Sequence, residues 1–182
     1  MGFKKCKECS ITIKGEDVTK WSTRKRLEKG ISYIPSARHE RALLPGFSIL
    51  DNYLLGNQYN EKYVKKGLIN NTNLNKTTLK LMKKYDVRAV DEKQAAGSLS
   101  GGNQQKMVLS REVEKDSDFI LVCQPVRGLD IGAIHYIHKI LLELRKQGKA
   151  ILLISAELTD IFQLSDRIAV LYKGEVMALR KN

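Results

Sequence analysis

Apolar residues in the second half of the chain are spaced as alternating strands and helices. Continuous apolar runs at Phe119–Val122 and Ala150–Ser155 are typical of buried parallel strands. Helices are predicted over Gly102–Glu114, Ile131–Gln147 and Leu158–Leu164, and two strands joined by a tight turn over Arg167–Tyr172 and Glu175–Leu179. This alternation is typical of an α/β fold with a mostly parallel sheet.

The first half of the chain predicts shorter elements. Strands are expected at Ser10–Gly15 and Ile31–Pro35, a helical segment at Thr23–Lys29 after the capping residue Ser22, a polar loop over 36–47, and a helix from Ser48 to about Asn57. Residues 58–96 are rich in Lys and Asn, and their apolar residues have mostly helical spacing. We therefore expect one domain over residues 1–182 that contains a helical subdomain at 45–97.

Composition favours a soluble domain with a basic first half. The 182 residues suit one core, and no apolar run approaches the roughly 18 residues that span a bilayer. The first 15 residues lack the apolar segment of a secretory signal, so we expect a cytosolic location. The net charge is +12, and residues 1–96 carry 20 Lys and Arg against 10 Asp and Glu. Solvated or membrane-proximal lysines are favoured over nucleic-acid binding, because interleaved aromatic residues are lacking.

The cysteines and histidines offer weak metal sites. Cys6 and Cys9 have the spacing of half a zinc site, but no second pair accompanies them, and two chance thiols are favoured. His135 and His138 lie three apart on a predicted helix without a third ligand, so core or surface histidines are favoured.

A turn from Leu99 to Lys106 carries the strongest chemical signal. Gly101 and Gly102 would let the backbone approach an anion, beside the Ser100 hydroxyl and the free N–H groups of a helix N-terminus. The alternative is a loop that merely caps a helix. No Gly-x-x-x-x-Gly-Lys-Ser/Thr loop occurs, because Gly148-Lys149 is followed by Ala150 and preceded by Glu143 at the first glycine position. The sequence therefore predicts half of a nucleotide site.

The order of motifs adds a resemblance. Leu99–Asn103 precedes a helix, the strand Phe119–Val122, the loop Pro125–Asp130 and the strand Ile151–Glu157. In this order the chain resembles the nucleotide-binding domain of ATP-binding cassette (ABC) transporters, with its signature, Walker B strand, D-loop and switch strand. Asn103-Gln104-Gln105-Lys106 and the Pro-x-Arg-Gly-Leu-Asp-x-Gly-Ala run are most similar to importers of simple sugars and nucleosides, in which one polypeptide carries two cassettes.

The resemblance covers about residues 10–180. The segment from Trp21 to His39 is similar to the part of a C-terminal cassette that follows Walker A. The resemblance therefore implies a P-loop NTPase-like core that is incomplete at the N-terminus, because the Walker A segment is lacking.

Four positions depart from the family pattern. Cys123 and Gln124 stand where the family has the Asp that holds magnesium and the Glu that polarises water, and neither is a good ligand or base. Ala156 replaces the switch histidine, and Ser36 stands near the place of the Q-loop glutamine. We therefore assign no catalytic residue and expect no ATP hydrolysis by this chain alone.

The resemblance implies the following roles, cofactor and partners. The signature, Leu99, Ser100, Gly101, Gly102, Asn103 and Gln104, would bind in trans the ATP and Mg that a partner cassette mainly holds, and Gly128, Leu129 and Asp130 would form the D-loop. The expected partners are a second cassette, transmembrane permease subunits and, indirectly, a substrate-binding protein, at the cytoplasmic face of the cell membrane. Two alternatives stay open: a non-transport cassette protein acting on nucleic acid or ribosomes, and an inactive truncated remnant.

Overall fold

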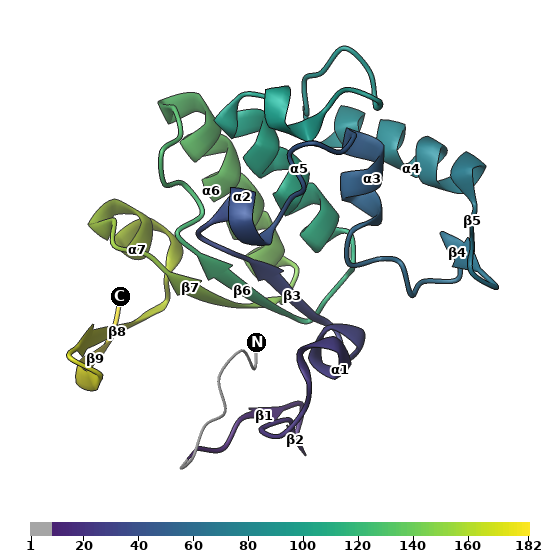
Figure 1. The fold of residues 1–182 in the computed structure, drawn as a ribbon. Coiled ribbons are helices and arrows are strands. Elements are labelled where there is room, and N and C mark those ends of the chain that lie inside the picture. Colours follow the sequence, from purple (N-terminus) through teal and green to yellow (C-terminus); the bar gives the residue numbers. More distant parts are fainter. Residues whose placement is uncertain (1–8) are drawn as a thin grey trace.

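A computed structural model describes residues 9–182 (Figure 1). The elements follow the order β1 (Thr12–Ile13), β2 (Glu16–Asp17), α1 (Thr23–Glu28), β3 (Ile31–Ile34), α2 (Arg38–Arg41), α3 (Ile49–Leu54), β4 (Val64–Lys65), β5 (Leu68–Ile69), α4 (Asn71–Lys84), a 3-10 turn (Ala96–Ser98), α5 (Gly101–Val113), β6 (Phe119–Cys123), α6 (Ile131–Lys146), β7 (Ala150–Ile154), α7 (Leu158–Leu164), β8 (Arg167–Tyr172) and β9 (Glu175–Lys181). The predicted α/β pattern of the second half is confirmed.

A parallel three-stranded sheet in the order β3-β6-β7 forms the centre of the molecule. The register places Ile34 beside Val122 and Val122 beside Leu153. Helices α5 and α6 lie on one side of the sheet (Figure 1), where buried side chains such as Met107 and Ile137 complete the core. Because the strands are parallel, their carboxyl ends meet at one edge of the sheet, where ligands commonly bind in α/β folds.

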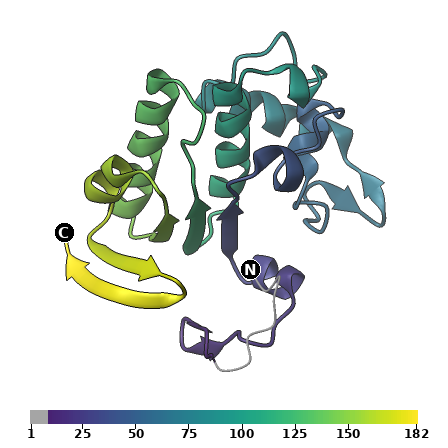
Figure 2. The same cartoon turned by 60° about the vertical axis from the view of Figure 1, so that its left-hand side comes forward.

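The other side of strand β7 is only partly covered. Ala150–Ser155 is expected to be a buried strand, but Leu152 is 51 % and Ile154 is 49 % exposed. In the described part of the chain β7 pairs with β6 alone, and β8 pairs with β9 in a separate antiparallel hairpin (Figure 2). A groove of about 710 Å³ separates β7 from this hairpin. The run of apolar residues identified the strand correctly, but it could not show that one face of the strand lacks a covering layer.

Capping residues fix the starts of the helices as the sequence predicts. The side chains of Ser22, Ser48 and Ser100 each accept a hydrogen bond from the backbone N–H three residues on. These bonds satisfy N–H groups that have no partner within the helix. The predicted cap at Ser22 and the predicted helix start at Ser48 are therefore confirmed, and α5 begins at Gly101, one residue before its predicted start.

Two short elements and one cysteine depart from the sequence-based predictions. The predicted loop over 36–47 contains the one-turn helix α2, and the predicted helical region 58–96 begins with the hairpin β4–β5. Lys66 and Gly67 form the tip of this hairpin, both with positive φ, as a tight two-residue turn requires. Cys9 is disulfide-bonded, whereas a free thiol was predicted; the prediction for Cys6 lies outside the described residues.

Within residues 9–182, none of the helices has the length and apolar character needed to cross a bilayer.

Candidate functional site

The N-terminus of helix α5 presents an exposed Ser-Gly-Gly turn. Ser100 is exposed, and its hydroxyl oxygen accepts hydrogen bonds from the backbone N–H of Asn103 at 3.4 Å and from its side-chain amide at 3.1 Å. The N–H groups of Gly101 and Gly102 lie in the first turn, where no helical carbonyl precedes them. The dipole of this 13-residue helix adds positive potential at the same end.

Both glycines have close neighbours. A Cβ atom on Gly101 would lie 2.8 Å from Nη2 of Arg38, and one on Gly102 would lie 3.1 Å from Cβ of Ala133. The absence of side chains therefore lets the Arg38 guanidinium lie against the turn and lets α5 pack closely on the start of α6. The positive charge of Arg38 adds to that of the helix terminus.

The side chain of Gln104 links the turn by hydrogen bonds to helix α2 and to the residues from Ala96 to Leu99. It is 3 % exposed, and its Oε1 accepts a hydrogen bond from Nε of Arg38 at 3.3 Å and lies 2.6 Å from Nε2 of His39. Its side-chain amide donates toward the carbonyl oxygens of three residues that precede the turn: Ala96, Gly97 and Leu99. This buried amide therefore holds the turn and helix α2 in one arrangement.

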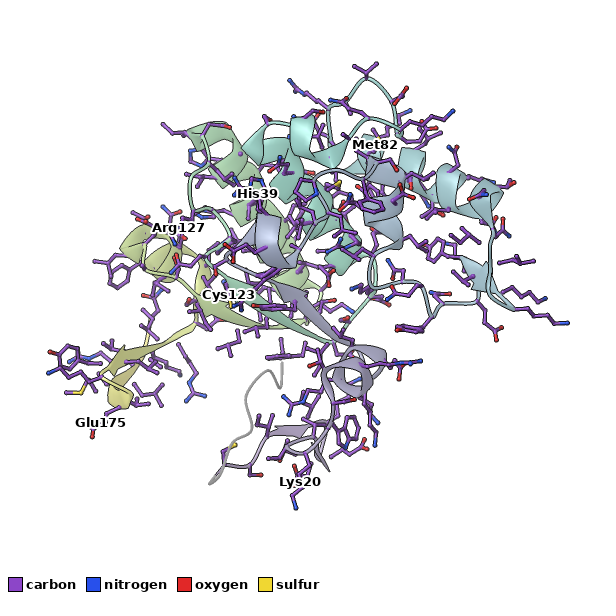
Figure 3. All side chains as sticks on the ribbon, in the orientation of Figure 1. Lys20, His39, Met82, Cys123, Arg127 and Glu175 are labelled. Carbon is purple, nitrogen blue, oxygen red and sulfur yellow. The ribbon has the colours of Figure 1, made fainter. Side chains whose placement is uncertain are left out.

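The segment from Arg127 to Asp130 packs against the same turn. Arg38 Nη1 donates to the carbonyl oxygen of Arg127 at 3.4 Å, and a side-chain carbon of Leu129 lies 3.6 Å from the position of a Cβ on Gly101. Asp130 caps α6 by accepting a hydrogen bond from the N–H of Ala133 at 2.9 Å. His39 and Arg127 lie on the same side of the molecule, above Cys123 (Figure 3). The structure thus brings the signature and D-loop positions together with Arg38 and His39.

The carboxyl edge of the sheet carries the four positions that depart from the family pattern. Ser36 follows β3, Cys123 ends β6 with Gln124 directly after it, and Ala156 follows β7. Gln124 has φ of 48°, and its N–H donates to the carbonyl of Ile154 at 2.7 Å, so the backbone turns sharply here. Burial raises the pKa of the Cys123 thiol above its ordinary value, which keeps it protonated at neutral pH.

Carboxylates near this edge have other partners or lie in solvent. Asp160 is buried, lies 3.0 Å from Nε2 of His138 and accepts a hydrogen bond from Ser155 at 2.9 Å. Glu157 is exposed, as is His135 on α6. Among residues 9–182 no three His, Cys, Asp or Glu side chains gather where they could hold a metal ion. His138 therefore belongs to the packing between α6 and α7.

Sequence reasoning missed the roles of Arg38 and His39. The resemblance includes both residues, but the prediction of a polar loop around them does not show which residues their side chains contact. A usable signal is their position two and three residues after Ser36, since a segment at the carboxyl end of a parallel strand lies beside the neighbouring loops.

The residues present fit one part of a nucleotide site. Ser100, the free N–H groups and Arg38 suit the negatively charged phosphates of ATP. Cys123 and Gln124 do not suit a magnesium ion, which prefers carboxylate oxygens.

Comparisons with known proteins show the family of the chain. The sequence profile of the family described as ABC transporter matches residues 1–127. The guanosine import ATP-binding protein NupO of Bacillus subtilis is 42 % identical over 177 residues, which cover 97 % of this chain and 35 % of that protein. The nucleoside import ATP-binding protein NupA of Lactococcus lactis subsp. cremoris is 39 % identical over 98 % of this chain and 35 % of its own length. The chain thus spans about a third of the length of these relatives.

Solved structures show the same fold. A nucleotide-free ATP-binding cassette from an ABC transporter has a TM-score of 0.77 at 21 % identity, covering 99 % of this chain and 72 % of that one. A dimeric cassette in a post-hydrolysis state, bound to ADP and Pi, has a TM-score of 0.76 at 21 % identity over 96 % of this chain and 73 % of that one. The matched profile shows that the chain belongs to the ABC transporter family, and the solved structures show that it has the fold of an ATP-binding cassette.

Proposed function

We propose that this chain is part of the C-terminal cassette of an importer for nucleosides or simple sugars, and that it donates its signature to ATP held by a partner cassette. The observation that carries the proposal is an asymmetry within one domain. The turn at Ser100–Gly102 is open and keeps its donors, whereas the carboxyl edge of the sheet ends in Cys123, Gln124 and Ala156. A domain of this kind can stabilise phosphate charge but offers no carboxylate to activate water.

The names of the relatives support the proposed cargo, and one solved structure supports the proposed partner cassette. NupO and NupA are named as import ATP-binding proteins for guanosine and for nucleosides. One matched cassette structure is dimeric and holds ADP and Pi, which supports a second cassette as the partner and ATP as the cofactor. The Mg that would accompany the ATP is carried over from the family resemblance. Permease subunits, and a substrate-binding protein acting through them, complete the proposed transporter, so the chain would work as a peripheral protein at the cytoplasmic face of the membrane.

The sheet supports a partial cassette over residues 1–182. The groove of about 710 Å³ lies between β7, whose outer edge is unpaired in residues 9–182, and the hairpin β8–β9. A parallel strand is normally covered on both faces, but the exposed Leu152 and Ile154 are not. We propose that a Walker A strand from further cassette sequence pairs with the outer edge of β7 and that other cassette sequence covers this face.

Two regions have proposed contacts with the other subunits. Residues 45–97, which contain α3, α4 and the β4–β5 hairpin, form the proposed helical subdomain. The segment from Ser36 to Tyr59 would lie nearest the permease, and Asp130 would support contact across the cassette dimer. The two contacts are carried over from the family resemblance, whereas the subdomain is proposed from the composition and helical spacing of residues 58–96.

Replacement of Ser100 tests the proposal. Ser100→Arg in the assembled transporter places a bulky side chain at the mouth of the turn, so we expect ATPase activity to fall by about 100-fold, with uptake falling in parallel. The control is Gln163→Arg, an exposed position on α7 away from the turn, which should leave both activities unchanged. Unchanged ATPase and uptake in the Ser100→Arg transporter would refute the proposal.

A further inference from the structure

A strongly basic projection formed by the β4–β5 hairpin and helix α4 is not used by the proposed function. Residues 58–84 contain seven lysines, one acidic residue, Glu61, and no arginine. The hairpin lies at the edge of the molecule, beyond the N-terminal end of α4 (Figures 1 and 2). The hairpin and the helix are joined by a hydrogen bond from the N–H of Asn70 to the carbonyl of Tyr63 at 2.8 Å. We call residues 62–84 the basic projection.

The outward face of α4 mixes lysines with one exposed leucine. Lys76, Leu79, Lys80 and Lys83 are spaced at i, i+3, i+4 and i+7, so they form one stripe along the helix. All four are exposed, and Leu79 is 46 % exposed. The buried residues of α4, Leu74, Thr78, Leu81 and Met82, lie on the opposite face. Leu79 thus exposes apolar surface within a stripe of lysines.

The hairpin repeats this combination. Lys65 and Leu68 are directly paired across the two strands, so their side chains share one face, and Leu68 is 76 % exposed. Ile69, on the other face, is 48 % exposed. Among the ion pairs within residues 9–182, Lys84 is paired with Glu114, and the six other lysines of the projection have no carboxylate partner. Their charge is therefore available to an external anion.

We propose that the basic projection binds the surface of an anionic lipid bilayer. The lysines would contact lipid phosphates and carboxylates, and the aliphatic chains of Leu68, Ile69 and Leu79 would enter the interfacial layer. Exposed aliphatic side chains among lysines suit a bilayer surface, because the lysines find anionic headgroups there and the aliphatic side chains find acyl chains. Nucleic-acid surfaces instead favour arginine and stacked aromatic side chains. The 182-residue chain would thus have a membrane contact of its own, independent of the permease.

Charge neutralisation with a matched control tests this proposal. The variant Lys65→Gln/Lys76→Gln/Lys80→Gln removes three charges of the projection, and Lys139→Gln/Lys146→Gln/Lys181→Gln removes three exposed charges elsewhere, so both variants have the same net charge. Binding of the 182-residue chain is measured by co-flotation with vesicles of phosphatidylcholine alone or mixed with phosphatidylserine. Circular dichroism confirms that each variant retains the fold.

We expect binding to the phosphatidylserine vesicles that weakens with added salt. The projection variant should bind roughly 100-fold more weakly, since each lysine contributes about fivefold, whereas the control should lose much less. Leu68→Ser should weaken binding by about fivefold without changing the salt dependence. Equal binding to neutral vesicles, which would point to the exposed face of β7, would overturn the proposal, as would equal losses in the two triple variants. Binding of the chain to single-stranded RNA but not to vesicles would also overturn it.

Discussion

The buried amide of Gln104 gives the sharpest test of how the signature turn is held. Gln104→Leu keeps the size of the side chain but removes its donor and acceptor groups. The carbonyl oxygens of Ala96, Gly97 and Leu99 lose a donor at 3.0–3.3 Å, and His39 loses its partner at 2.6 Å. An unsatisfied buried polar group costs about 1–3 kcal/mol, and the two amide hydrogens serve at most two carbonyls at a time. We therefore expect a loss of about 2–4 kcal/mol.

The free energy of unfolding is measured by urea denaturation of the purified chain. Gln163→Leu, at an exposed position, is the matched control and should change stability by about 0.5 kcal/mol or less. A Gln104→Leu chain as stable as the control would show that the Gln104 amide does not stabilise the turn.

Two further predictions concern buried groups outside the turn. Burial raises the pKa of Tyr53 to about 12, so its hydroxyl ionises more easily in the unfolded chain than in the folded chain. The stabilisation from the neutral Tyr53 side chain is complete below about pH 10. It should be lost at roughly 1.4 kcal/mol per pH unit as the pH rises from there to about 12. Alkaline urea titrations should show this slope, and Tyr53→Phe should reduce it. Asp160→Leu should lower the free energy of unfolding by about 2–4 kcal/mol, because His138 and Ser155 lose their buried partner; a Tm equal to that of the parent chain would contradict this.

Local signals in the sequence predicted the elements well. Ser22, Ser48 and Ser100 each precede a helix because a hydroxyl can cap the first turn, and this needs no knowledge of distant residues. The apolar runs of β6 and β7 likewise identify parallel strands. The small elements were harder, because α2 and the hairpin β4–β5 have four and two residues per element and leave almost no periodic pattern.

The contacts of the site depend on the tertiary fold. The turn at Ser100–Gly102 follows from residue types and order alone. Its support does not, because Arg38 and Gln104 are 66 positions apart and meet only when β3 and α5 pack together. The exposure of Leu152 is also invisible in the sequence, since an apolar residue in a strand looks the same whether or not a layer covers it.

The structure of the assembled transporter with a non-hydrolysable ATP analogue would show directly whether the signature of this chain acts in trans. We expect the partner cassette to hold the nucleotide, with the Ser100 hydroxyl and the N–H groups of Gly101 and Gly102 within about 3 Å of its terminal phosphate. Terminal-phosphate oxygens bound in this way would establish the role of the signature in trans. A nucleotide whose phosphates contact no atom of this turn would exclude that role.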